Sequence, residues 1–179
     1  MRAAYELFSR SGSRTVGVDA VVAKAAVAKM TLYRHFPSKE NLVLAFLERR
    51  EQLWTHDWLT AEIVRRETQP AARLLAIFDV FGEWFHTPDF EGCTFIQILL
   101  EHTDLTDPVR VATVANLEHI RGFLRELATD AGISDPDGFA RQWHILMKGS
   151  IISAVEGDTE AAARAREMGT LLLQHRGTI

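Results

Sequence analysis

Residues 29–42, KMTLYRHFPSKENL, gather hydrogen-bond donors in one short stretch of an acidic chain. The first eleven positions hold three basic side chains together with a threonine, a tyrosine and a histidine. Such groups can donate to base edges in the major groove of DNA and to phosphate oxygens. The chemistry that this stretch offers is therefore recognition of a polyanion.

The charge of the chain is divided unevenly and supports this interpretation. The net charge is −4, yet the first 50 residues carry nine basic and four acidic side chains, a balance of +5. The remaining residues carry 11 basic and 20 acidic side chains, a balance of −9. A basic head on an acidic body favours a head that faces nucleic acid. Solvated surface charge without a partner is the alternative.

Composition and motifs exclude several other classes. The chain has 179 residues, 47% of them apolar, and a single cysteine, Cys93, so no disulfide can form within it. No apolar run approaches the ~20 residues that cross a bilayer, and no signal peptide is visible, so we expect a cytoplasmic protein without a membrane partner. GxSxG, P-loop, GxGxxG and HExxH motifs are absent, so we expect no enzyme and no cofactor. The dispersed histidines predict no metal site.

Apolar spacing predicts an all-α fold of about nine helices joined by short loops. Gly12 is expected to end the first helix and Ser38 to cap the fourth. The expected helices cover residues 2–11, 18–25, 29–35, 38–66, 70–86, 93–103, 107–130, 136–156 and 159–175.

Two short helices that follow a bracing helix have the arrangement of a helix-turn-helix. The second helix must then present polar side chains to the major groove while flanking groups hold phosphates. The outward candidates are Lys29, Thr31, Arg34 and His35, and the phosphate-facing candidates are Thr15, Tyr33 and Lys39, with backbone N–H groups near Gly17 and Ser38. The alternative is a plain amphipathic helical head in which Tyr33 and Phe36 belong to the core.

Residues 15–47, TVGVDAVVAKAAVAKMTLYRHFPSKENLVLAFL, resemble the DNA-binding segment of the tetracycline-repressor family. The resemblance implies a helix-turn-helix domain over residues 1–47 and an effector-binding and dimerisation domain over residues 48–179. It implies that Thr15 and Gly17 meet phosphate, that Lys29, Met30 and Thr31 lie nearest the bases, and that Tyr33, His35 and Lys39 contact the DNA backbone. Three positions depart from the family: Ala26 replaces a frequent glycine in the turn, Ala28 replaces a frequent serine cap, and Met30 occupies a place often held by a small residue.

The resemblance further implies a homodimer built on the last two helices. We expect one stripe of these helices to form the interface, consisting of Phe139, Trp143, Met147, Ser150, Ile151, Ala154, Ala161, Ala165, Met168 and Leu172. The alternative is that this stripe only seals the core of the protomer.

Aromatic residues in the acidic body suggest a pocket for a small hydrophobic effector. The candidates are Phe78, Phe81, Trp84, Phe85, Phe95, Gln97, Phe123, Trp143, His144 and Met147, although aromatic residues at helical spacing are more often core. We expect a repressor that binds a palindromic operator in double-stranded DNA and is released by the effector. The alternatives are a DNA-binding protein without an effector and a metal- or redox-responsive regulator that uses histidines and Cys93.

Overall fold

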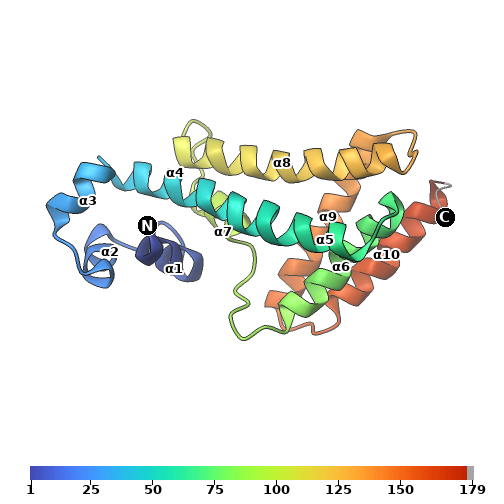
Figure 1. The fold of residues 1–179 in the computed structure, drawn as a ribbon, viewed down its shortest axis with the longest axis horizontal. Coiled ribbons are helices and arrows are strands. Elements are labelled where there is room, and N and C mark those ends of the chain that lie inside the picture. Colours follow the sequence, from blue (N-terminus) through green and yellow to red (C-terminus); the bar gives the residue numbers. More distant parts are fainter. Residues whose placement is uncertain (177–179) are drawn as a thin grey trace. The chain divides into compact units, whose positions relative to one another are not determined.

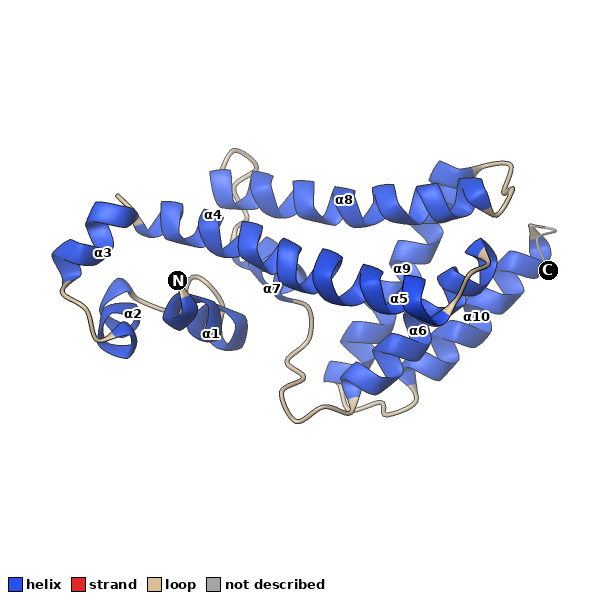
Figure 2. Ribbon diagram, viewed as in Figure 1, coloured by secondary structure: helices blue, strands red, loops and turns tan. Residues whose placement is uncertain are grey.

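The computed structural model describes residues 1–176, and in these residues the regular secondary structure is helical, without a strand (Figure 2). The predicted all-α fold is confirmed. The helices are α1 (Arg2–Ser11), α2 (Val18–Ala25), α3 (Lys29–His35), α4 (Lys39–Arg50), the π-helix η1 (Glu51–Thr60), α5 (Ala61–Arg66), α6 (Pro70–Phe85), α7 (Thr94–Glu101), α8 (Pro108–Asp130), α9 (Pro136–Val155) and α10 (Ala161–His175).

The ends of these helices follow local sequence signals. The Ser38 side chain accepts a hydrogen bond from the backbone N–H of Asn41 at 3.0 Å, which caps α4 as predicted. Gly12 ends α1 at a positive φ of 74°. The segments α4, η1 and α5 follow one another without a break from Lys39 to Arg66 (Figure 1), so the described chain forms the nine continuous helical stretches that periodicity predicts.

The chain divides into two compact units. The first unit combines residues 1–53 with residues 93–117, and the second contains the rest of the described chain. In the structure α7 and the first part of α8 group with the N-terminal head, and the predicted domains of residues 1–47 and 48–179 stay a prediction. The boundaries at residues 53/54 and 117/118 fall inside η1 and α8.

The head of the first unit has an aromatic core. The rings of Phe8 from α1 and Phe46 from α4 meet edge to face at 5.5 Å, and both side chains are fully buried. Tyr5 packs on Phe46 in the same manner at 5.4 Å, and Leu42 of α4 is buried as well. This core fixes α1 against α4.

The core of the second unit lies between α6, α9 and α10. Phe78 and Trp143 pack at 5.3 Å, and Phe139 stacks on Trp143 at 5.2 Å. The backbone of α10 comes so close at Gly169 that a Cβ there would lie 2.7 Å from the Trp143 ring. Gly169 therefore permits the close approach of α10 to these aromatic rings.

Most of the predicted dimer stripe lies in this core. The buried members are Phe139, Trp143, Met147, Ser150, Ile151, Ala161 and Ala165. These seven side chains pack inside the protomer, as the alternative states, and their part in a dimer interface stays a prediction. Met168 is exposed, and Ala154 and Leu172 are partly exposed.

His144 is a polar residue in the same core. Its side chain is 3% exposed, and its Nδ1 has no hydrogen-bond partner within the described chain. Burial lowers the pKa of His144 to about 3, and the positive charges of Lys148 and Arg121 act in the same direction. His144 is therefore neutral in the folded protein at neutral pH.

We expect His144→Leu to reduce the acid sensitivity of the fold. Below the unfolded pKa of about 6.5 the unfolded chain binds a proton that the folded chain excludes, so wild-type stability falls as the pH falls. Between pH 7 and pH 5 the wild type should lose about 2 kcal/mol more than the variant, measured by urea unfolding at both pH values. His175→Leu, which changes an exposed histidine, is the control. Equal losses in wild type and His144→Leu would contradict the assignment.

Candidate nucleic-acid interface

A tight turn joins α2 to α3. Ala26 adopts the left-handed conformation, with φ 53° and ψ 43°, and its N–H donates to the carbonyl of Ala23 at 3.2 Å. For a residue other than glycine this conformation costs about 1 kcal/mol, which gives a physical meaning to the departure from the family's frequent glycine. Ala28, at the N-cap of α3, makes no side-chain cap, as its residue type predicts.

The helix α3 is exposed on most of its surface. Of its seven residues only Leu32 is buried, whereas Met30 is 83% and Tyr33 is 40% exposed. Arg34 and His35 are exposed as well. Thr31 is partly exposed. The side chains of α3 that the sequence assigns to base and phosphate recognition are therefore accessible to a ligand outside the head.

Lys29, the first residue of α3, forms an ion pair with Asp19 of α2. Its Nζ lies 2.7 Å from Oδ1 of Asp19 in α2, and this hydrogen bond raises the pKa of Lys29. Both side chains are more than half exposed, so water and salt screen the pair strongly. A phosphate oxygen or a base acceptor can therefore replace Asp19 at little expense.

Three of the phosphate-facing candidates, Thr15, Gly17 and Lys39, lie around the turn before α2. Thr15 and Gly17 are exposed in this turn, and Gly17 stands at the N-cap of α2. Lys39, at the start of α4, donates from Nζ to the carbonyl of Arg14 at 3.3 Å. The structure thus brings Lys39 next to the turn that contains Thr15, although the two residues are far apart in the sequence.

One residue of this region was not predicted from the sequence. The carboxylate of Glu101, at the end of α7, accepts hydrogen bonds from the backbone N–H groups of Ser13 and Arg14 at 2.8 and 3.0 Å. The Glu101 and Ser13 positions are 88 residues apart, so no local pattern could indicate the contact. Ser13 is 1% exposed, which places the contact at the base of the turn.

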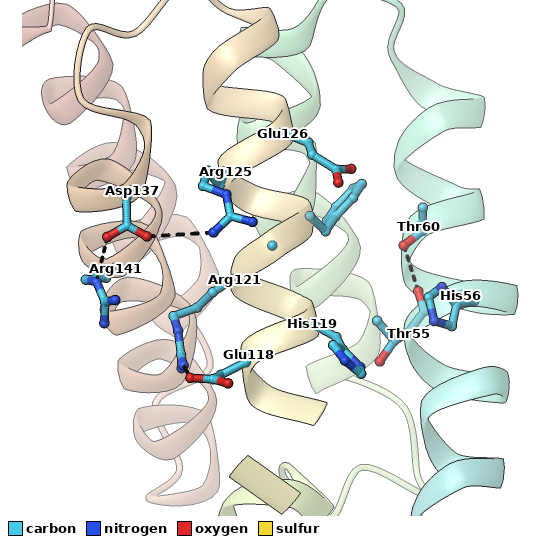
Figure 3. Close-up of a pocket in the computed structure, with 12 residues that line it drawn as sticks. Thr55, His56, Thr60, Glu118, His119, Arg121, Arg125, Glu126, Asp137 and Arg141 are labelled. Atoms are coloured by element: carbon cyan, nitrogen blue, oxygen red, sulfur yellow. Dashed lines mark hydrogen bonds and ion pairs between the residues drawn. The ribbon is translucent and has the colours of Figure 1, made fainter. Parts of the chain in front are cut away.

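The second unit contains a pocket of about 690 Å³ between η1, α8 and the start of α9 (Figure 3). Polar and charged side chains dominate its wall. Its lining residues are Thr55, His56, Thr60, Glu118, His119, Arg121, Gly122, Phe123, Arg125, Glu126, Asp137 and Arg141.

The charged groups of this pocket are arranged in pairs. Arg121 donates to Glu118 at 3.0 Å, and Asp137 lies between Arg125 at 3.9 Å and Arg141 at 3.0 Å (Figure 3). The pairs around Asp137 are largely exposed. Polar atoms of a small molecule can therefore compete for the same arginine and carboxylate groups.

The π-helical segment shapes one wall of the pocket. Thr55 and Thr60 stand five residues apart, the spacing of one π-turn, and both line the pocket. The Thr60 hydroxyl donates to the Thr55 carbonyl at 2.8 Å, while the buried Thr55 hydroxyl has no hydrogen-bond partner within the described chain (Figure 3). Such departures from α-helical geometry are frequent at functional sites.

Comparison with known proteins identifies the family. Residues 1–46 match the bacterial regulatory proteins of the tetR family, and residues 70–168 match the tetracyclin repressor-like C-terminal domain. The chain belongs to the TetR family. It is thus a DNA-binding transcriptional regulator, and the exposed α3 is the second helix of its helix-turn-helix motif.

Several relatives of this TetR-family chain are known. A TetR transcriptional regulator from Streptomyces avermitilis is 28% identical and superposes with a TM-score of 0.87 over 98% of this chain and 94% of its own. The transcriptional regulator AcuR of Cereibacter sphaeroides is 27% identical, over 86% of this chain and 74% of its own. The transcriptional activator FasR of Mycolicibacterium smegmatis is 32% identical over 63% of this chain, which spans only about half (51%) of FasR.

Within the TetR-family body, the predicted aromatic pocket residues lie mainly elsewhere. Of these ten residues, Phe123 lines the polar pocket. The buried ones are Phe78, Phe81, Phe95, Trp143, His144 and Met147, and the partly exposed ones are Trp84, Phe85 and Gln97. Reasoning from the sequence did not predict the polar lining, because arginines and carboxylates at helical spacing resemble an ordinary solvated helix face.

Two further findings concern partners other than DNA. Within residues 1–176 no helix has both the length and the apolar character needed to span a bilayer. The same residues contain no group of three histidine, cysteine or acidic side chains that could hold a metal ion. Cys93 stands at the N-cap of α7 and is partly exposed.

Proposed function

We propose that this protein is a homodimeric repressor that inserts α3 of each protomer into the major groove of a palindromic operator. The observation that carries the proposal is the exposure of α3, which presents Met30 and Arg34 outward while Leu32 alone anchors it. Two such helices, about 34 Å apart, would meet two half-sites on one face of DNA. FasR is a transcriptional activator, and activation is the alternative direction of regulation.

The side chains have distinct roles in this proposal. Lys29, Met30 and Thr31, at the start of α3, read base edges, with the exposed Met30 directed at apolar groups such as a thymine methyl. Arg34 and His35 extend the contact along the groove. The groups that hold phosphates and set the register are Thr15, the Gly17 backbone N–H, Tyr33, His35 and Lys39.

Lys39→Ala should weaken binding to all DNA sequences alike, because a phosphate contact carries no sequence information. The slope of log K against log [salt] should fall by about 0.9 for each phosphate that the variant no longer neutralises. Thr31→Ala should instead change the base preference in a binding-site selection. Arg49→Ala, which removes a charge about 15 Å further along the helix that starts at Lys39, is the control. A change of preference in Lys39→Ala, or an unchanged preference in Thr31→Ala, would refute these roles.

The proposal of a dimer is supported by exposed apolar side chains on the neighbouring helices α9 and α10. On α9, Ile145 is 66% and Ile152 is 43% exposed, with the exposed Gly149 between them. On α10, Met168 is 56% and Leu171 is 59% exposed. Positions separated by three, four and seven residues lie on one face of a helix. Because α9 packs on α10, we propose that these two faces together meet their copies in the partner protomer.

Ile152→Asp should therefore convert the dimer to monomers, since it places a charge in the centre of an apolar interface. Sedimentation velocity measures the assembly, and the monomer should bind operator DNA more weakly than the wild type. Leu100→Asp, at a residue that is 71% exposed in the first unit, is the matched control. A dimer that persists in Ile152→Asp at micromolar concentration would exclude this surface.

We further propose that the polar pocket of the second unit binds a small polar effector rather than the hydrophobic one expected from the aromatic residues. The exposed arginine–carboxylate pairs around Asp137 are suited to polar groups of a ligand. A regulator of Saccharomonospora viridis that is 20% identical and shares this fold at a TM-score of 0.75 is solved in complex with choline, so a protein of this fold can hold a small organic cation.

Effector binding would act as a population shift. The pocket lies against η1 and α8, the two helices that continue across the unit boundaries. A ligand that binds one arrangement of these helices more tightly than another would shift the dimer between states with different half-site spacing. The strength of release is then set by the difference in ligand affinity between the two states.

Gly122 offers a direct test of the pocket. A Cβ at this position would meet nothing nearer than Arg125 Nη2 at 4.0 Å, so Gly122→Ala should leave the pocket open, whereas Gly122→Leu should fill it. A compound found by thermal shift should stabilise wild type and Gly122→Ala, by about 2.7 kcal/mol at 100 times its Kd, but not Gly122→Leu. Equal stabilisation of all three proteins would place the effector elsewhere.

A further inference from the structure

We propose that Glu101 is a positioning residue for DNA binding. Its carboxylate, at the end of α7, holds the turn between α1 and α2 in the shape that presents Thr15, Gly17 and Lys39 to phosphates. This inference rests on the proposed role of the head in DNA binding and adds a residue that lies far from the helix-turn-helix motif in the sequence.

The carboxylate is bound by three donors. Oε2 of Glu101 accepts hydrogen bonds from the Ser13 N–H at 2.8 Å, the Ser13 hydroxyl at 2.8 Å and the Arg14 N–H at 3.0 Å. Successive backbone N–H groups that converge in this way form a nest for an anion. Hydrogen bonds to a charged acceptor are about twice as strong as neutral ones. The turn is thus organised around a negative charge that α7 supplies.

The turn is shaped for the close approach of this carboxylate. Gly12 has a φ of 74°, and a Cβ at this position would lie 1.8 Å from Oε1 of Glu101. Any larger residue at position 12 would therefore displace the carboxylate as well as strain the backbone. The Ser13 side chain is buried beneath it.

A second set of hydrogen bonds holds the end of α7 in place. Nε2 of His102 lies 2.9 Å from the Ser13 hydroxyl, and Nδ1 lies 2.7 Å from Oδ2 of Asp107. The other oxygen of Asp107 caps α8 by accepting from the Val109 N–H at 2.8 Å. Arg110 donates to the carbonyl of His102 at 2.9 Å. Glu101 therefore reaches the turn from a fixed support.

The turn connects Glu101 with the residues of the proposed phosphate contacts. The N–H of Arg14 is held by Glu101, and the carbonyl of Arg14 accepts from Lys39 Nζ at 3.3 Å. Thr15 and Gly17 follow directly in the chain. Without the carboxylate, the two N–H groups would have to bond to water. Thr15, Gly17 and Lys39 would then no longer be held in fixed positions relative to one another.

Charge alone predicts the opposite result from positioning, which makes the proposal testable. Removing an acid from the head lowers its repulsion of DNA, so a purely electrostatic role for Glu101 predicts tighter binding on its replacement. Positioning predicts weaker binding. Glu48→Ala removes an equal charge from an exposed site on α4 of the same unit and serves as the matched control.

The experiment measures operator affinity of the full-length protein at several salt concentrations. Glu101→Ala should bind about tenfold more weakly than the wild type, and its salt slope should fall by up to about 0.9 because Lys39 no longer reaches its phosphate. Glu101→Gln, which keeps an acceptor oxygen without the charge, should weaken binding about fivefold and retain the fold. Glu48→Ala should bind as tightly as the wild type or more tightly.

Combination with Lys39→Ala separates this inference from the proposed function. If Glu101 acts by placing Lys39, Glu101→Ala should add less in the Lys39→Ala background than alone. A folded Glu101→Ala or Glu101→Gln dimer with wild-type affinity and salt slope would overturn the positioning role while leaving DNA binding intact. Loss of thermal stability without any change in the affinity of the folded protein would overturn it as well. An unchanged affinity in Lys39→Ala would instead refute the proposed phosphate contact.

Discussion

The exposure of α3 depends on aromatic rings buried behind it. A helix of seven residues is too short to be stable alone in water, and α3 buries only Leu32. Its position is fixed by the neighbouring helices, which the edge-to-face contact of Phe8 and Phe46 holds together. The apolar residues of α1 and α4 therefore supply the stability that lets the intervening helix present its polar side chains to a ligand.

Local sequence preference contributes little to this part of the molecule. The left-handed Ala26 is strained, and the N-cap of α3 at Ala28 lacks a side-chain hydrogen bond. Both features weaken the turn that aims α3. The head has to compensate by packing, and the carboxylate of Glu101 adds a second constraint at the turn before α2. Because that carboxylate comes from α7, the order of the DNA-facing surface includes a residue well outside residues 29–42.

The sequence predicts the helices well because their limits are local. Ser38, Gly12 and Pro70 each mark a helix end through their own hydrogen bonding or backbone geometry, and the structure places those ends at these residues. Contacts between distant segments are different in kind. No sequence signal near Ser13 indicates its contact with Glu101. The packing of residues 93–117 with the head is therefore visible only in the three-dimensional structure.

The helix α9 shows why periodicity could not separate core from interface. It carries one stripe with Phe139, Trp143 and Met147 and a second with Ile145 and Ile152. Both have helical spacing, and both are apolar. Trp143 packs against Phe78 and Phe139 inside the protomer, which places its stripe in the core. Side-chain size does not decide the matter alone, because Ile151 is 3% exposed whereas Ile152, of equal size, is 43% exposed. The buried face of α9 is therefore set by the helices that pack on it, which the period of its own sequence does not reveal.

The same reasoning applies to the effector. In the second unit the rings of Trp54, Trp58 and Trp84 lie 5.4–5.8 Å apart, so these aromatic side chains pack on one another. The pocket beside η1 is walled instead by groups that water already solvates. A ligand gains affinity there only if its polar atoms replace the hydrogen bonds that it removes from water and from the ion pairs. For the proposed effector, discrimination against analogues would follow from the geometry of those replacements, because an analogue that lacks one polar group would leave an arginine or a carboxylate without a partner.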